Sequence, residues 1–460
     1  MSSPISAVAA QPHTSGHPRS RPVALLGISL GYFMVLLDMT VLSVAEPDLA
    51  RSLHSSVAGL QWVVTGYTVV FGALLLSAGA VADRYGAHRS FRAGIVVFAL
   101  GSLLSALAPN LWTLIALRSL LGIGAAATVP ASIAMVARLY PLPAERAKAV
   151  AAWAATSGSA LAAGPVVGGV LVDLAGWRAI FLINVPLGAL TLVLTAGRAV
   201  RCPRGDRIID WPAQLAACAA LGLVTDALIA CGEGEPVHAG AATLAAVAAG
   251  MVFIVLERRS TAPVLAAAVL RTSGMRAALL AGAAVNFMMS AVLFLLPLFF
   301  HQVLRLTPAE AGFAFLPMTL PFAVNPLLTG RIVARTGPGR PVLAGLGLLA
   351  AAGLILGAAV AIPAPYPVVV VGLVCTGFGV SLALPALVTM VVGAAPEGGA
   401  GAAGGLLNAI RQVGATFGVA ITGVFATTGQ PGTGHGTAAV LVLCSGICAT
   451  AAIGIRYRQE

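Results

Sequence analysis

The chain has 460 residues, of which 59% are hydrophobic and only 9% are charged, and its mean hydropathy is +0.97. A water-soluble domain carries about 25% charged residues, so this composition excludes a soluble protein and predicts an integral membrane protein. The net charge of +11 does not indicate nucleic-acid binding, because the arginines recur in short clusters between apolar stretches and do not form one patch.

The predicted secondary structure is entirely helical. A helix needs roughly 20 mostly apolar residues to cross a bilayer, and fourteen stretches of the chain meet that requirement. In chain order they cover residues 23–45, 58–79, 91–108, 111–131, 147–172, 179–198, 210–230, 239–256, 277–299, 311–330, 341–362, 367–392, 403–427 and 437–455. We therefore predict an all-α membrane protein with fourteen transmembrane helices.

The basic residues predict the orientation of these helices. With a cytoplasmic N-terminus, only Arg51, Arg178 and Arg305 fall on the outer side, and Arg118 and Arg411 fall within helices. The other twenty-one of the 26 basic residues then lie on the cytoplasmic side, as the positive-inside rule requires. A missed helix would scramble this alternation, so we predict a multi-pass protein of the plasma membrane with both termini cytoplasmic.

The loops are too short for a further domain, since the longest has about twenty residues, near 257–276. The chain also lacks the G-x-x-x-x-G-K loop that binds nucleotide phosphates, which argues against an ATP-driven pump. Its six cysteines show no arrangement typical of a metal site. We expect no cofactor and no metal, with an ion gradient as the source of energy.

Two similar segments indicate an internal repeat. Residues 79–86 (GAVADRYG) end the second predicted helix, and residues 330–337 (GRIVARTG) end the tenth on the same side of the membrane. Such repeats are typical of the two halves of a transporter. We predict a cytoplasmic tail (1–22), a six-helix bundle (23–200), two inserted helices with their loops (201–276), a second six-helix bundle (277–455) and a short tail (456–460).

Several motifs, in the right order on the right helices, resemble the major facilitator superfamily and its fourteen-helix drug/proton antiporter branch. They are Leu37-Asp38-Met39-Thr40-Val41 with Val44, Ala45 and Pro47; Gly79, Asp83, Arg84 and Gly86; Arg118, Gly122 and Gly124; Gly164, Pro165, Gly168 and Gly169; Trp177, Arg178 and Asn184; and Asn408, Arg411, Gln412 and Gly414. The resemblance covers nearly the whole chain. It implies two helical bundles that rock about a central site, a gating loop at residues 79–86, and an antiporter motif at residues 164–169.

The chain also departs from that pattern. Ser43 and Glu46 stand where the branch usually has an asparagine and an apolar residue, and either change can alter substrate choice. Ala334 stands in the second repeat where Asp83 stands in the first, so a clasp based on this aspartate exists in one half only.

Asp38 is the strongest candidate for proton coupling. A carboxylate at this depth costs about 2.5–3.5 kcal/mol on insertion scales, which makes a function the default interpretation. Asp38 and Arg118 each lie seven residues inside the outer end of a predicted helix, roughly 10 Å deep. If the first and fourth helices adjoin, as the resemblance implies, the two charges can pair, and protonation of Asp38 would release Arg118. The alternative is a permanent structural ion pair.

Other residues are candidates for substrate binding or coupling. We expect Ala160, Gly164 and Gly168 to form a flat helix face that seals the two halves against each other, with ordinary helix packing as the alternative. Arg411 lies about 12 Å inside its helix and either faces the site or extends back to the interface. Glu46 and Asp226 are expected at the outer membrane interface, with coupling as the alternative. The remaining candidates are Asn286, Asn408 and Gln412.

Together these features predict proton-coupled efflux of small amphipathic or lipophilic compounds by alternating access, by a chain acting as a monomer. A narrow-specificity exporter of an endogenous metabolite or lipid is the alternative. A membrane-embedded enzyme is disfavoured because no nucleophile with its base lies at one depth. A channel is disfavoured by the repeat and the buried charges.

Overall fold

The computed structural model describes residues 20–197, 201–205, 209–260, 273–362, 364–395, 400–427 and 435–456. These residues form sixteen helices and no strand. The helices are α1 (Ser20–Ser52), α2 (Val57–Tyr85), α3 (Ala87–Ala106), α4 (Leu111–Leu139), α5 (Pro143–Ala175), α6 (Ala179–Leu182), α7 (Asn184–Leu194), α8 (Trp211–Glu233), α9 (Pro236–Arg259), α10 (Ser273–Gln302), α11 (Pro308–Ala314), α12 (Leu316–Thr336), α13 (Gly339–Ala361), α14 (Tyr366–Gly393), α15 (Ala400–Thr427) and α16 (His435–Arg456).

These helices occupy all fourteen stretches that the sequence predicts. Single residues, Ile183 and Phe315, separate α6 from α7 and α11 from α12, so each pair fills one predicted stretch. Among the described helices, eleven are long and apolar enough to cross a membrane. Most of the two predicted tails lies outside the described residues, as do Arg198, Arg207 and Arg271 of the orientation argument.

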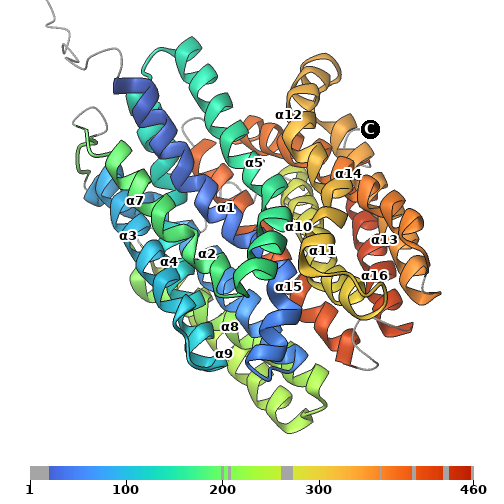
Figure 1. Cartoon of the computed structure of the whole chain (residues 1–460). Coiled ribbons are helices and arrows are strands. Elements are labelled where there is room, and N and C mark those ends of the chain that lie inside the picture. Colours follow the sequence, from blue (N-terminus) through green and yellow to red (C-terminus); the bar gives the residue numbers. More distant parts are fainter. Residues whose placement is uncertain are drawn as a thin grey trace, which may run out of the picture.

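The helices pack in two groups with matching internal contacts. In the first group α1 packs along α5 and α3 along α4; in the second, α10 packs along α15 and α13 along α14. Figure 1 shows the blue-to-green helices α1 to α7 on one side of the molecule and α10 to α14 and α16 on the other. The repeat seen in the sequence therefore corresponds to a repeat of packing.

The two repeated loops end α2 and α12 in the same way. Gly86 and Gly337 follow the last helical residues with φ of 91° and 76°, a conformation that residues with a Cβ rarely adopt. Glycine at the end of each repeat is therefore required by the backbone.

The inserted helices α8 and α9 form a hairpin beside the seam between the two groups. Helix α8 packs against both α2 and α15, and α9 packs against α8. Gln214 on α8 donates a hydrogen bond to the carbonyl of Ala73 and accepts one from Ser77, both on α2. Near the other end of α8, Gly232 lies against Val424 of α15. The hairpin is thus hydrogen-bonded to one group and packed against the other.

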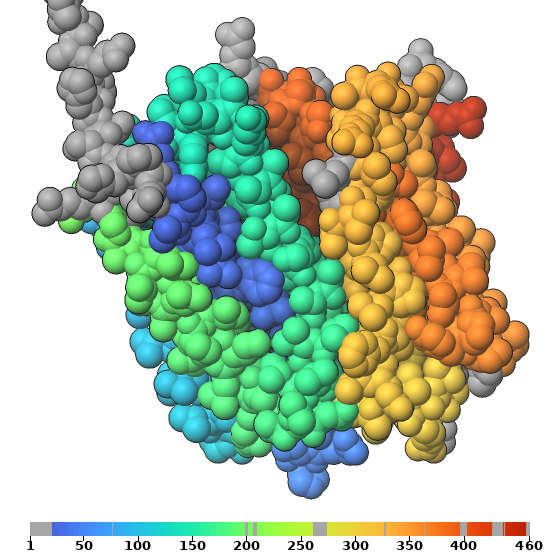
Figure 2. All heavy atoms as spheres, turned by 45° about the horizontal axis from the view of Figure 1, so that its top comes forward, coloured from blue at the N-terminus to red at the C-terminus, as the bar shows by residue number. Residues whose placement is uncertain are grey.

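The two groups touch mainly in the half of the molecule away from the start of α1. Gln61, Thr68 and Gly72 of α2 contact α15 there, whereas nothing lies within 4 Å of a Cβ placed on Gly79 or on Gly404. Figure 2 shows the resulting hollow between the teal α5 and the gold α12 at the opposite end. The start of α1 and the last turn of α16 both lie at this open end (Figure 1).

Candidate functional site

The predicted ion pair forms inside the first bundle. A guanidinium nitrogen of Arg118 donates to Oδ2 of Asp38, and both side chains are almost fully buried, with 1% of their surface exposed. Asp38 and Arg118, which the sequence placed at equal depth, are therefore in direct contact across α1 and α4. The amide nitrogen of Asn184, at the start of α7, donates to the other carboxylate oxygen of Asp38 at 3.2 Å and lies 3.2 Å from the hydroxyl of Ser102. Side chains from two other helices, α4 and α7, thus hold this carboxylate.

Arg118 has two further partners on α2. Its Nε donates to the carbonyl of Val63 at 3.1 Å, and its Cζ lies 4.6 Å from the centre of the Tyr67 ring. A guanidinium over an aromatic face is attracted by the negative face of the ring. These partners hold Arg118 in place independently of Asp38.

A cavity lies between the two groups, next to this cluster. Its wall includes Arg118 and Tyr67 but not Asp38, which lies behind them. The centres of water-sized molecules can occupy about 70 Å³ of it, enough for several ordered waters since one needs roughly 10–15 Å³. The other lining residues come from α1, α2, α4, α5, α10, α14 and α15 and are largely apolar. A change at Asp38 can therefore reach the cavity through Arg118.

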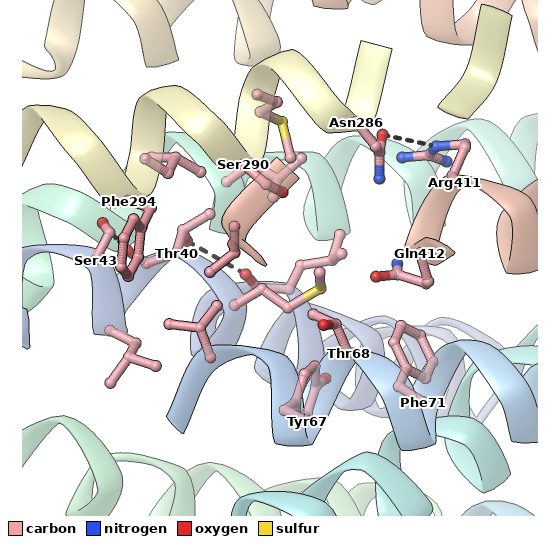
Figure 3. Close-up of a pocket in the computed structure, with 18 of the residues that line it drawn as sticks. Thr40, Ser43, Tyr67, Thr68, Phe71, Asn286, Ser290, Phe294, Arg411 and Gln412 are labelled. Carbon is pink, nitrogen blue, oxygen red and sulfur yellow. Dashed lines mark hydrogen bonds between the residues drawn. The ribbon is translucent and has the colours of Figure 1, made fainter. Parts of the chain in front are cut away.

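Arg411 lies at one end of this cavity (Figure 3). Its Nε donates to the amide oxygen of Asn286 at 3.1 Å, and its Nη1 donates to that of Asn408 at 3.0 Å. The side chain therefore faces the cavity and does not extend back to the interface. Gln412 also lines the cavity, and its buried Oε1 has no hydrogen-bond partner among the described residues. The structure brings four of the predicted candidates together here.

The interfacial placement predicted for Glu46 is wrong. Glu46 is only 3% exposed and lines the cavity. The predicted helix ended at residue 45, whereas α1 continues to Ser52, so Glu46 is almost two turns inside the helix. Asp226 is also about two turns inside its helix, α8, but its side chain is 26% exposed, and its Oδ2 is 3.0 Å from Nε2 of His238 across the α8–α9 hairpin. It lies outside the cavity wall.

The antiporter motif has two faces. A Cβ on Gly164 would meet the side chain of Thr40, and one on Gly168 would meet the carbonyl of Val41, so the predicted flat face packs on α1 within its own bundle. The close contact between the halves is made by the neighbouring stripe of α5. There Gly169 packs against the carbonyl of Pro308, and Gly312 of α11 packs against that of Pro165, at 2.3 Å from an added Cβ in both cases. The stripes differ because residues i and i+1 point about 100° apart on a helix.

The loop predicted to act as a gate, residues 79–86, lies at the open end and contacts the segment that follows α7. The Gly205 amide donates to the carbonyl of Asp83 at 2.8 Å, and the Cys202 amide donates to Nδ1 of His88 at 3.0 Å. Asp83 and Arg84 are exposed, while Gly86 is buried close to the Cys202 carbonyl. This loop therefore lies outside the cavity, and it contacts the start of the link to α8.

Comparisons with known proteins agree with this architecture. The sequence profile of the Major Facilitator Superfamily matches residues 28–419 and 278–459. The chain belongs to this superfamily. It is 36% identical to the methylenomycin A resistance protein of Bacillus subtilis (strain 168), over 87% of this chain and 86% of that protein. It is 35% identical to the multidrug resistance protein Stp of Mycobacterium tuberculosis (strain CDC 1551 / Oshkosh), over 88% of this chain and 76% of Stp.

A solved structure with the same fold is a bacterial homologue of the human lysosomal transporter Spinster, crystallised in an inward-facing and unoccupied conformation. It superimposes with a TM-score of 0.69 at 18% identity, over 96% of this chain and 97% of that one. The chain is accordingly a multi-pass membrane transporter of the major facilitator superfamily and not an enzyme.

Sequence reasoning missed several polar residues of this major facilitator site. Asn184 appeared only as part of a motif, and Tyr67 and Gln61 were not considered. A polar residue inside an apolar stretch is the signal that could have identified them, because such groups need partners in the membrane. Gln61 illustrates this, since its amide nitrogen donates to the carbonyls of Val419 and Ala420 across the seam between the bundles, at 3.2 and 2.7 Å.

Proposed function

We propose that this chain exports small amphipathic or lipophilic compounds in exchange for protons, as a member of the fourteen-helix drug/proton antiporter branch. The buried Asp38–Arg118 pair carries the proposal, because its arginine also forms part of the cavity wall. Members of the superfamily generally use ion gradients and need no cofactor. The names of the two relatives, a resistance protein and a multidrug resistance protein, favour efflux over uptake.

The coupling step is a competition for Asp38. While the carboxylate is charged, Arg118 and Asn184 hold it, and the cluster joins α1, α4 and α7. A proton on Asp38 removes the negative charge, so Arg118 loses its counter-ion while it keeps Val63 and Tyr67 as partners. An uncompensated buried guanidinium is costly, and the least costly response is to turn its free nitrogens toward the cavity. The proton thereby changes the wall that the substrate contacts.

The places where the bundles touch support alternating access. In the described conformation the seal consists of α2 with α15 and α5 with α11, and the cavity lies on the other side of it. With the positive-inside orientation, the open end faces the cytoplasm and receives the compound. Rocking of one bundle against the other would close that end and break the seal. Glycines on α5 and α11 let the two backbones approach closely at the seal.

The breadth of substrates is a separate question. Methylenomycin A names a single antibiotic, whereas Stp is named for several drugs, so the relatives' names support both a narrow and a broad exporter. Growth of a pump-deficient host carrying this chain, tested against dyes and antibiotics of unrelated structure, separates the two. Protection against one chemical class only would favour the narrow exporter.

The test of coupling uses inverted membrane vesicles and a compound to which the chain gives resistance. Addition of that compound to energised vesicles should release protons from the lumen, read as recovery of a quenched pH-sensitive dye. Asp38→Asn should abolish the recovery and the resistance. Glu145→Gln, which alters an exposed acid at the start of α5, should change neither. Proton release by Asp38→Asn at the rate of the unaltered chain would contradict the assignment of coupling to Asp38.

A further inference from the structure

Glu46 is a buried acid without an assigned role in this mechanism. It is 97% buried, and its Oε2 has no hydrogen-bond partner among the described residues. An ionised carboxylate in such surroundings is strongly destabilising unless a proton or a cation neutralises it. Within the described chain no basic side chain forms an ion pair with it. The proton or cation that neutralises this carboxylate must therefore come from outside the described fold.

The position of Glu46 on α1 directs it toward the cavity. The cavity-lining residues of this helix follow a helical stripe and include Tyr32, Leu36, Thr40, Ser43 and Glu46. Asp38 is eight residues before Glu46, which corresponds to about 12 Å along the helix and a rotation of about 80°. The two acids consequently have different surroundings: Asp38 contacts Arg118 inside the bundle, whereas Glu46 faces the space between the bundles.

The cavity is electrically asymmetric along α1. Arg411 and Asn286 lie at one end of the cavity and Ser43 lies beside Phe294 at the other, as Figure 3 shows. Tyr32 belongs to the first end, since it interacts electrostatically with Arg411. Glu46 is one helical turn beyond Ser43, and about 21 Å along the helix from Tyr32. Arg411 and Glu46 are thus too far apart to neutralise each other. Phe294 and Leu293, both buried, add apolar surface to the cavity wall.

We propose that Glu46 is a substrate-recognition residue that selects compounds with a cationic centre on an aromatic or apolar body. The carboxylate binds the cation, and the neighbouring Phe294 ring and aliphatic side chains contact the apolar body. An apolar residue at this position would leave the same end of the cavity suited to neutral compounds. This inference rests on the proposed export function, since it names the substrate class of that cavity.

The test compares two probes of similar shape and different charge. Tetraphenylphosphonium is a lipophilic cation, and triphenylphosphine oxide is a neutral compound with the same aromatic groups. Binding of each to the purified full-length chain is measured by titration calorimetry. The unaltered chain should bind the cation more tightly, and Glu46→Gln should weaken cation binding by about tenfold or more, as expected for loss of a close charge pair. Its affinity for the neutral probe should change less than about twofold.

Controls separate recognition from damage to the fold. Glu145→Gln is the matched acid-to-amide change outside the cavity and should bind both probes as the unaltered chain does. A second measurement needs no variant: labelling of Glu46 by dicyclohexylcarbodiimide, mapped by mass spectrometry, should be slowed by tetraphenylphosphonium and not by triphenylphosphine oxide. Equal weakening of both probes in Glu46→Gln, no preference for the cation in the unaltered chain, or no protection from labelling would each overturn the proposal. Failure of the export function would appear separately, as a chain that binds the cation but neither protects cells nor moves protons.

Discussion

Neutralising the buried ion pair one charge at a time should affect stability unequally. Asp38→Asn leaves Arg118, 1% exposed, without a counter-ion, and a guanidinium stays charged at any accessible pH. Removal of one partner from a buried pair costs about 3–5 kcal/mol. Arg118→Gln leaves a carboxyl instead, which can lose its charge by binding a proton. The double change Asp38→Asn with Arg118→Gln removes both charges and should recover most of the stability lost in Asp38→Asn.

The assay is the free energy of unfolding of the purified chain in mixed micelles, measured between pH 8 and pH 5. Arg118→Gln should lose less stability than Asp38→Asn, because a carboxyl group can be neutral whereas a guanidinium cannot. Asp38→Asn has no titrating group at this site, and its deficit should not change with pH. Two results would refute the idea that each buried charge is stabilised by the other. One is equal stability of Asp38→Asn and the unaltered chain, and the other is a double variant that is less stable than both single variants.

Three further outcomes test other parts of the structure. Gly169→Ala should weaken the contact between the bundles and lower resistance severalfold, because an added Cβ would lie 2.3 Å from a carbonyl oxygen of α11. The control Gly347→Ala on α13, with nothing within 4 Å of the added Cβ, should leave growth in the presence of the exported compound unchanged. Gln214→Ala should lower the thermal midpoint by removing two hydrogen bonds to α2, worth about 1–3 kcal/mol if their partners stay buried. Leu215→Ala, which changes a residue of α8 that is 65% exposed, should not lower it. Burial raises the pKa of the Cys202 thiol, despite the opposite effects of His88 and Arg138. Maleimide labelling of this cysteine at pH 7 should therefore be slower in the folded than in the denatured chain. The labelling rate of the folded chain should rise steeply above pH 8 as the thiolate forms.

Much of the architecture could be predicted from the sequence because the bilayer imposes a simple rule. Every spanning segment must be apolar and helical for about 20 residues, so composition alone located the helices. The depth of Asp38 and Arg118 followed from counting residues along two such helices, and their pairing needed only that α1 and α4 adjoin. The repeat of residues 79–86 and 330–337 likewise reflected a backbone requirement, since each segment ends in a glycine with positive φ.

The tertiary structure decided what residue counting along a single helix cannot. Glu46 could have faced lipid headgroups or the cavity. The outcome depended on where α1 ends and on which face of α1 lies against α10, and the local sequence pattern determines neither of these. The two stripes of the antiporter motif were assigned to α1 and α11 only by the packing of three helices. The roles of Asn184 and Gln61 were hidden for the same reason, because their partners lie 146 and more than 350 residues away. A sequence records how deep a polar group lies in the membrane, but its partner depends on how the helices are rotated and packed.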